Sequence, residues 1–243
     1  IKSCLNQNLC KKLKILVVYS KLSNENSLKN EFKNSKNIIF LKNIIKKKLP
    51  TQDQLYKIEK AINHINDKWV LLLDGDDLFD RKKVSYIERL KLKKNFIYLN
   101  DFISINKDLT KNYYKKKSYK KLSLYKKFFN DWPEKINTSS IIVHSNLLKK
   151  FYKLHNPYKW KFLAIDVQLV LFYFYKKKFL YLNKILTFKK ENVNNLDKTF
   201  TNYFKKIYWS RRYEQHKMTK QLSSKMNLID RLLTIFFKNI LNS

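Results

Sequence analysis

The stretch Trp69-Val-Leu-Leu-Leu-Asp-Gly-Asp-Asp77 decides the fold. Its apolar run is long enough for one buried strand and ends abruptly in three carboxylates around Gly75, the only glycine of the chain. A glycine used once, between Asp74 and Asp76, indicates a close backbone approach or an unusual backbone dihedral. Carboxylates at the C-terminal end of a strand lie where α/β folds bind ligands. This acidic strand end is therefore the candidate functional site.

Strands alternate with helices on the N-terminal side of this stretch. Pro50 opens a predicted helix in which Thr51 and Gln54 have the spacing of a capping box. The alternation predicts an α/β fold with a mostly parallel, twisted sheet flanked by helices. The other elements predicted here are the end of a helix at Ile1–Gln7, strands at Lys14–Val18, Asn37–Leu41 and Trp69–Asp74, and a helix at Asn24–Lys33.

The C-terminal half continues as α/β and ends in a helical region. The predicted elements are helices at Lys82–Leu92, Ser145–Leu154 (capped by Ser145), from Asp166, and at Phe200–Leu222, a strand pair at Asn95–Ile105, and strands at Thr138–Val143 and Phe179–Phe188. Residues 223–243 form a separate amphipathic helix with one apolar stripe: Leu228, Ile229, Leu232, Leu233, Phe236, Phe237 and Ile240. This stripe could pack on the domain, pair with another subunit, or lie in a membrane interface.

The net charge of +34 is typical of a nucleic-acid-binding protein. However, the chain is rich in Lys, Asn, Ile, Phe and Tyr and has few arginines, which is typical of an AT-rich coding sequence. We therefore do not expect nucleic acid as the partner. The alternative function is a non-catalytic RNA-binding protein, in which Lys111–Phe129 supplies a basic groove with Tyr and Phe stacking platforms.

A single glycine excludes several ways of binding a nucleotide. A dinucleotide fingerprint, a Walker A loop and the loop of sugar-nucleotide pyrophosphorylases all need several glycines around phosphate. An EF-hand is excluded because Phe79 and Ser85 occupy the positions that require Gly and Glu. Asp74, Asp76 and Asp77 are instead oxygen ligands suited to Mg²⁺ or Mn²⁺ bridging to a phosphate. The alternative is a solvated acidic turn that caps the following helix.

Several motifs occur in an order that resembles family 2 glycosyltransferases of the GT-A fold. Leu73–Asp77 resembles the D-x-D strand end of that family, Ile1–Gln7 its first-helix motif, and Lys14–Val18 its second strand. Weaker similarity continues through Thr138–Ile142, Ala164–Asp166 and Trp209–Arg212. The resemblance thus covers residues 1–222 as one GT-A-like domain.

This resemblance implies an inverting, metal-dependent glycosyltransferase. Such an enzyme moves a sugar from a nucleotide-sugar donor to an acceptor hydroxyl of a glycan or lipid-linked acceptor, in cell-surface glycan synthesis. By resemblance, Asp76 ligates the metal, Asp74 contacts ribose or metal, Asp77 assists, Asp166 is the catalytic base, and Arg211 and Arg212 clamp the diphosphate. For Asp166 the alternative is a carboxylate favoured by a helix dipole, and for the arginines a solvated helical pair. His216 is interpreted as an ordinary surface or core histidine.

The chain departs from the family at two places. Tyr19-Ser20 stands where the second strand usually ends in acidic, base-binding residues, so Asp53, Gln54 or Lys57 are the candidates for base recognition. The first strand of the family is expected to be missing, since the sequence begins one element late. This departure predicts a weaker nucleotide site rather than a different fold.

The compartment predicted from the sequence is the cytoplasm. Two cysteines, Cys4 and Cys10, fit a reducing environment without a disulfide framework. No signal peptide is visible, and the longest apolar stretch, Phe162–Tyr175, is too short to span a bilayer. Peripheral contact with the inner membrane face is left open.

Overall fold

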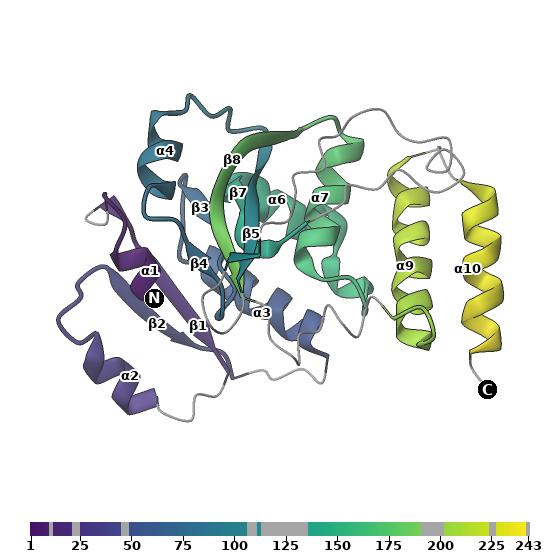
Figure 1. Ribbon diagram of the computed structural model, residues 1–243, viewed down its shortest axis with the longest axis horizontal. Helices are drawn as coiled ribbons and strands as arrows, with labels where there is room; N and C mark the ends of the chain where they lie inside the picture. The colour runs from purple at the N-terminus through teal and green to yellow at the C-terminus, as the bar shows by residue number, and fades with distance from the viewer. Residues whose placement is uncertain are drawn as a thin grey trace.

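The computed structural model describes residues 1–9, 12–20, 25–44, 49–105, 111–112, 136–190, 202–223 and 227–241 (Figure 1). For residues 111–112 it describes the backbone alone. Cys10 and nearly all of the Lys111–Phe129 segment lie outside these residues, so the RNA-binding groove predicted there is not described.

The N-terminal elements follow the prediction. They are α1 (Lys2–Leu5), β1 (Ile15–Tyr19), α2 (Glu25–Glu31) and β2 (Ile38–Lys42). β1 and β2 form a parallel pair in which Ile15 is opposite Ile38. The two strands can be parallel because α2 lies between them in the sequence and carries the chain back to the end of the sheet at which β1 begins.

The main sheet is mixed, which corrects the prediction of mostly parallel strands. Its order is β3 (Trp69–Leu71), β7 (Ile141–His144), β5 (Ile97–Ile105), β8 (Phe179–Lys190) and β4 (Leu78–Phe79), and β6 (Lys111–Asn112) pairs with β5. β5 and β8 are parallel, whereas the β3–β7, β7–β5, β8–β4 and β5–β6 pairs are antiparallel. The α/β class with helices flanking the sheets is confirmed. The direction of pairing was missed because an apolar run shows that a strand is buried but not which neighbour it meets.

The predicted strand pair at Asn95–Ile105 is one long strand, β5. Its register against β8 shifts between Asn100 and Phe102, which is a bulge in the pairing. A bulge changes the alternation of side chains along a strand, so a single strand can look like two in the sequence pattern. β7 is also shorter than predicted because Thr138–Ser140 form a 3-10 turn before it.

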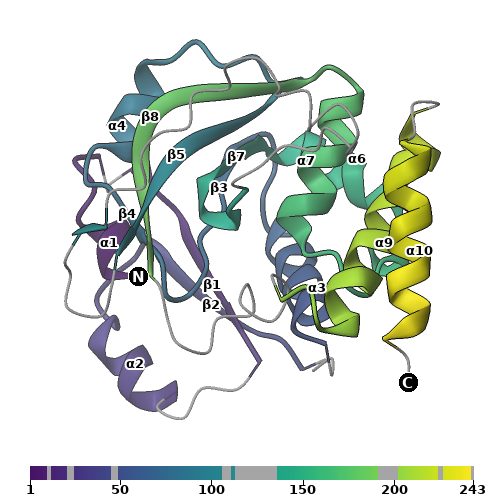
Figure 2. The same cartoon turned by 45° about the vertical axis from the view of Figure 1, so that its right-hand side comes forward.

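Helices α3 (Pro50–Ile62), α6 (Ser145–His155) and α7 (Ile165–Tyr175) lie between the main sheet and the C-terminal helices (Figure 2). α7 is buried over most of its length and forms the centre of the core with Leu55, Leu99 and Phe151. The short helix α4 (Lys83–Arg89) follows β4 and lies with α1 at the other side of the sheet.

Two predicted helix caps are wrong. Leu49, not Thr51, is the N-cap of α3, because the Thr51 hydroxyl donates to the carbonyl oxygen of Lys161 at 2.6 Å. His144, not Ser145, caps α6, and its Nδ1 accepts from the amide of Asn146. Thr51 is used by a distant segment, and Ser145 is replaced as the cap by the residue before it.

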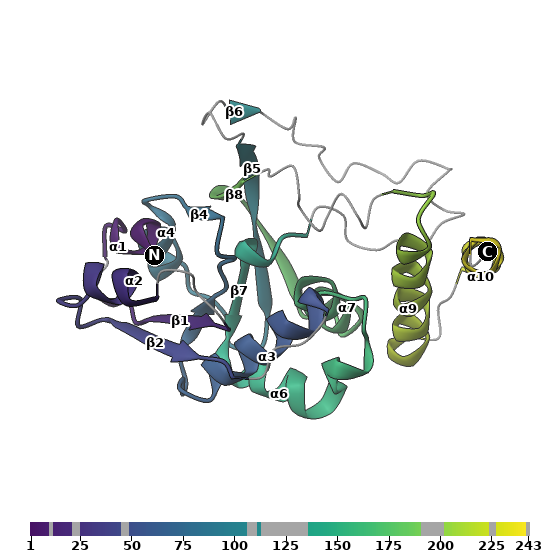
Figure 3. The same cartoon turned by 90° about the horizontal axis from the view of Figure 1, so that it is seen from below.

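The C-terminal region is a pair of helices, α9 (Lys206–Leu222) and α10 (Leu228–Ile240), packed side by side (Figure 3). The amphipathic character predicted for α10 is confirmed, although its apolar stripe is largely exposed to solvent. Among the described residues, none of the helices combines the length and apolar character needed to cross a bilayer.

Candidate active site

The three aspartates that follow β3 form a tight turn. The amide of Asp77 donates to the carbonyl oxygen of Asp74 at 3.2 Å, which leaves Gly75 and Asp76 exposed at the tip. The amide of Asp74 donates to Ser139 Oγ at 2.9 Å and ties the start of the turn to the segment before β7. The turn is thus held at one end by the sheet and presents Asp76 to solvent.

Gly75 does not have the backbone property predicted for it. Its φ angle is not positive, and a Cβ built on it would meet no atom of the described residues within 4 Å. The fold of the chain alone therefore does not require a glycine here. What remains is open space directly over the tip of the turn.

Asp77 is buried and its carboxylate faces the protein interior. Asn137 donates to its Oδ2 at 3.1 Å, and the amide of Lys190 donates to its Oδ1 at 3.0 Å. Burial raises the pKa of Asp77, although hydrogen bonds from Ser139, Asn137 and Lys190 oppose the rise. Asp77 therefore anchors the turn to the end of β8 and does not point to the tip.

Asp74 is partly buried and is the most strongly perturbed carboxyl group of the site. Gln54, in the first turns of α3, donates its Nε2 proton to Asp74 Oδ1 at 2.9 Å. Burial, followed by the charges of Asp166 and Asp77, raises the pKa of Asp74 to about 7. Near neutral pH this carboxyl group is consequently balanced between its neutral and charged forms.

Asp166 stands in the first turn of α7, as the sequence predicted. Its Oδ1 accepts from the amide of Val167 at 2.7 Å, and its charge acts on Asp74 across the site. The fold therefore brings together two carboxyl groups that are far apart in the sequence. A backbone N–H and the positive end of a helix dipole favour the charged form of a carboxylate at such a position.

The start of α3 joins the end of β1 to the acidic turn. The Ser20 hydroxyl donates to Asp53 Oδ1 at 3.1 Å, and Lys57 lies 2.7 Å from the Asp53 carboxylate. Gln54, one residue further along, reaches Asp74 as described above. The residues predicted to recognise a base thus lie at the same edge of the fold as the aspartates.

Arg212 was predicted to clamp the diphosphate, but its guanidinium is paired with a carboxylate of the protein itself. Its guanidinium donates to both carboxylate oxygens of Asp230 in α10, at 2.6 and 2.7 Å from Nη2. His216 Nε2 lies 3.1 Å from the same carboxylate and is buried, which confirms its interpretation as a core histidine. Burial would raise the pKa of Asp230, but the hydrogen bonds from His216 and Arg212 outweigh it and lower the pKa. Arg211 is the neighbouring residue on α9 and is partly buried.

Lys83 lies next to the acidic turn and was not predicted as a site residue from the sequence. It is fully buried and donates to the carbonyl oxygen of Ser139 at 2.7 Å and to Thr187 Oγ1 at 3.0 Å. Burial lowers the pKa of Lys83 well below its ordinary value. Because Ser139 also accepts from the amide of Asp74, Lys83 helps to hold the acidic turn in place through Ser139. No sequence signal distinguishes it among so many lysines.

The residues at the turn fit a metal shared with a ligand rather than a complete protein cage. Within the described ranges, no group of three or more His, Cys, Asp or Glu side chains is arranged to hold a metal ion by itself. Mg²⁺ commonly takes one or two carboxylates, keeps several waters, and completes its shell with substrate phosphates. The exposed carboxylate of Asp76, with Asp74 behind it, has the chemistry for that kind of site.

Solved structures with a similar fold support the GT-A-like class. The chain superposes on S. aureus TarS residues 1–349 in complex with UDP, with a TM-score of 0.60 and 11% identity over 99% of this chain and 65% of that one. The complex with UDP-GlcNAc gives a TM-score of 0.61 and 10% identity over 99% and 66% of the two chains. This chain thus spans slightly less than two thirds of the TarS chains. No protein-family model and no curated protein sequence matches it.

Proposed function

We propose that the acidic turn and Asp166 form the donor and catalytic site of a metal-dependent nucleotide-sugar glycosyltransferase. The observation that carries the proposal is the meeting of Asp74 and Asp166 at the edge where β3 ends and α3 begins. A carboxyl group that titrates near neutral pH at the end of a strand, with a second carboxyl group close by, is suited to proton transfer beside a bound phosphate. The similar fold of TarS, with its UDP and UDP-GlcNAc complexes, adds independent support.

A UDP-sugar is the donor to test first. Ser20, Asp53 and Gln54 form a polar line from the end of β1 to the acidic turn. A nucleotide lying along that line would place its base near β1 and its diphosphate near Asp76. The open space over Gly75 would then admit the diphosphate against the backbone of the turn.

Asp76 is the proposed metal ligand, with Asp74 in support. Mg²⁺ or Mn²⁺ bound there would neutralise the charge that develops on the departing nucleoside diphosphate. Asp77 keeps the turn in place through Asn137 and Lys190, and Lys83 does so through Ser139. The turn is thus a rigid support for one exposed carboxylate, which favours precise placement of the ligand.

Asp166 is the proposed base. It accepts from the amide of Val167 at the start of α7, and this position favours the carboxylate form that a base needs. Burial and the charge of Asp166 raise the pKa of Asp74 to about 7. Asp166 would remove the proton of an acceptor hydroxyl while the oxygen of that hydroxyl attacks the anomeric carbon of the sugar. The nucleoside diphosphate would leave from the opposite face. A single displacement of this kind inverts the anomeric centre, and the acceptor is proposed to belong to a cell-surface glycan.

Calorimetric titration with UDP-, GDP- and CMP-sugars in the presence of Mn²⁺ tests the proposed site. We expect one nucleotide class to bind, and Asp76→Asn to reduce its affinity by about tenfold or more, since a charge-assisted contact is lost. The matched control is Asp67→Asn, at the opposite end of β3. Equal affinity of Asp76→Asn and the wild type, or binding of none of the sugars, would contradict the proposal.

A further inference from the structure

Helix α10 has its polar side buried and its apolar side in solvent. Asp230 and Thr234, one turn apart, are buried against the rest of the protein. The outward face of α10 is formed by residues between 49% and 58% exposed, namely Leu228, Ile229, Leu232, Phe236 and Ile240. Large apolar side chains gathered on one helix face at this exposure mark an interaction surface.

The contacts of α10 with α9 explain this orientation. The Arg212 guanidinium of α9 donates hydrogen bonds to the Asp230 carboxylate of α10, and Trp209 stacks on Phe237 with ring centres 4.7 Å apart. These contacts turn the buried side of α10 toward α9 and the outward face away from it. Figures 2 and 3 show α10 at the outer edge of the molecule, next to α9.

Two further exposed aromatic residues lie near the C-terminal part of α10. Phe204 is 87% exposed and Tyr203 is 63% exposed, just before the start of α9. Tyr203 contacts Tyr208, which in turn contacts Trp209, the residue stacked on Phe237. Tyr203 is thus linked to the C-terminal part of α10 through ring contacts that end at Phe237. Aromatic side chains of this kind are enriched at membrane–water interfaces.

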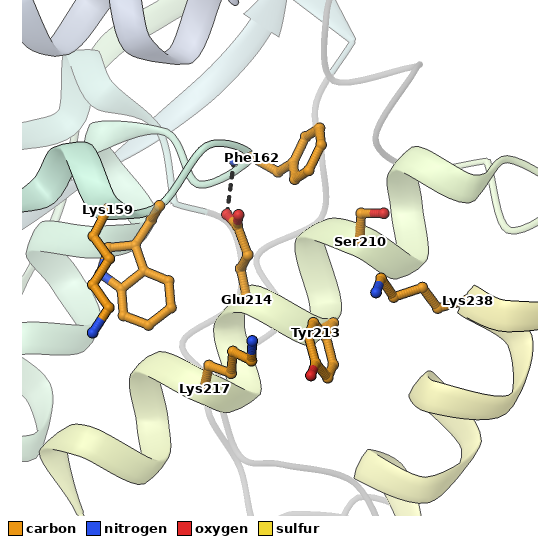
Figure 4. Close-up of a pocket in the computed structure, with 8 residues that line it drawn as sticks. Lys159, Phe162, Ser210, Tyr213, Glu214, Lys217 and Lys238 are labelled. Atoms are coloured by element: carbon orange, nitrogen blue, oxygen red, sulfur yellow. Dashed lines mark hydrogen bonds between the residues drawn. The ribbon is translucent and has the colours of Figure 1, made fainter. Parts of the chain in front are cut away.

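Positive charge lines a cavity bounded by α9, α10 and the segment 159–162. A cavity of about 270 Å³ contains Lys159, Lys217 and Lys238, with the last two each 4.5 Å from the centre of the Tyr213 ring (Figure 4). A neighbouring cavity of about 510 Å³ adds further cationic residues, Lys220 and Arg231. The acid of the first cavity, Glu214, is occupied by the amides of Lys161 and Phe162.

We propose that the outward face of α10 docks on the surface of an anionic phospholipid bilayer. The apolar side chains would enter the boundary between headgroups and acyl chains, and the net positive charge of the chain would attract it to lipid phosphates. Charge complementarity favours this partner over a second copy of the chain. Each copy carries a net charge of +34, so two copies repel, and the single acid of α10, Asp230, is buried and paired.

Co-sedimentation of the whole chain with vesicles tests the proposal without requiring catalytic activity. We expect strong binding to vesicles of phosphatidylglycerol and phosphatidylcholine, weaker binding to phosphatidylcholine alone, and release by salt. The double variant Leu232→Asn, Phe236→Asn should weaken binding by about tenfold or more, because two apolar side chains leave the interface. The matched control is Leu154→Asn, Leu180→Asn, which removes two exposed apolar residues outside α10.

The α10 variant should fold normally, because the altered side chains are exposed; an unchanged thermal melt checks this. Vesicle binding that is lost in the α10 variant and kept in the control supports the proposal. Equal binding by both variants overturns it. A concentration-dependent dimer that the α10 variant abolishes, with vesicle binding unchanged, also overturns it and assigns the face to a second copy.

Discussion

Because the pKa of Asp74 is raised on folding, its carboxyl group lowers the stability of the folded protein at neutral pH. Its pKa is about 7 in the folded protein, against an ordinary value of 3.8. A carboxyl group whose pKa rises on folding binds more protons in the native state, so stability falls as pH rises between those two values and stays low above them. About three pKa units correspond to at most ~4 kcal/mol.

Substituting Asp74→Asn should therefore stabilise the protein. Asparagine removes the charge and keeps the oxygen that accepts from Gln54. We expect the variant to exceed the wild type by about 2 kcal/mol near pH 8, roughly half of that limit, and to equal it near pH 4. For a chain of this size the gain corresponds to a Tm rise of about 4–8 °C. Urea unfolding and thermal melts over this pH range measure both quantities.

The control for this prediction is Asp67→Asn, the same substitution at an exposed position. A hydrogen bond from Lys94 lowers the pKa of Asp67, which is the opposite shift. Asp67 has a φ of 46°, a conformation that asparagine also accepts. This control should bring no gain at any pH. If Asp74→Asn were no more stable than the wild type near pH 8, a raised pKa of Asp74 in the folded protein would be refuted.

Other predictions concern the pairing of α9 with α10 and the residues around the acidic turn. Asp230→Asn should lower the free energy of unfolding by about 3–5 kcal/mol, because Arg212 loses the charge partner of a largely buried pair; a loss below ~1 kcal/mol in urea would contradict this. Gly75→Ala should leave the Tm nearly unchanged but weaken donor binding in calorimetry, since only a ligand needs the space there. In the wild type, stability should rise with pH between the lowered pKa of Lys83 and its ordinary pKa of 10.5, because the unfolded chain binds the proton more tightly there. Lys83→Met should flatten that rise in urea unfolding. A wild-type curve that is already flat would argue against the shift.

The sequence was sufficient for the elements that local patterns determine. The apolar run before Asp74 predicted a strand ending in an acidic turn, and the position of Asp166 in the first turn of a helix was also confirmed. Both signals depend on residues that are neighbours in the chain. The fold class followed from the order of such elements, and the similar fold of TarS agrees with it.

The features that failed depend on distant partners. Thr51 and Gln54 have capping-box spacing, but Lys161 and Asp74 use their side chains instead. Arg212 was expected at the donor because its motif resembled the family, whereas its guanidinium is hydrogen-bonded to Asp230 of α10. Strand direction in the main sheet failed for the same reason, since it is decided by long-range pairing that no local pattern records.

The most direct test of the central claim is turnover of the nucleotide-sugar that binds best, followed as release of the nucleoside diphosphate in the presence of Mn²⁺. The wild type should release it, and Asp166→Asn should lower kcat by about 100-fold or more while keeping the affinity for the donor, because only the proton acceptor is lost. Asp67→Asn should retain the wild-type rate. An Asp166→Asn variant as fast as the wild type, or a wild type that releases no diphosphate, would contradict the assignment of this site to glycosyl transfer.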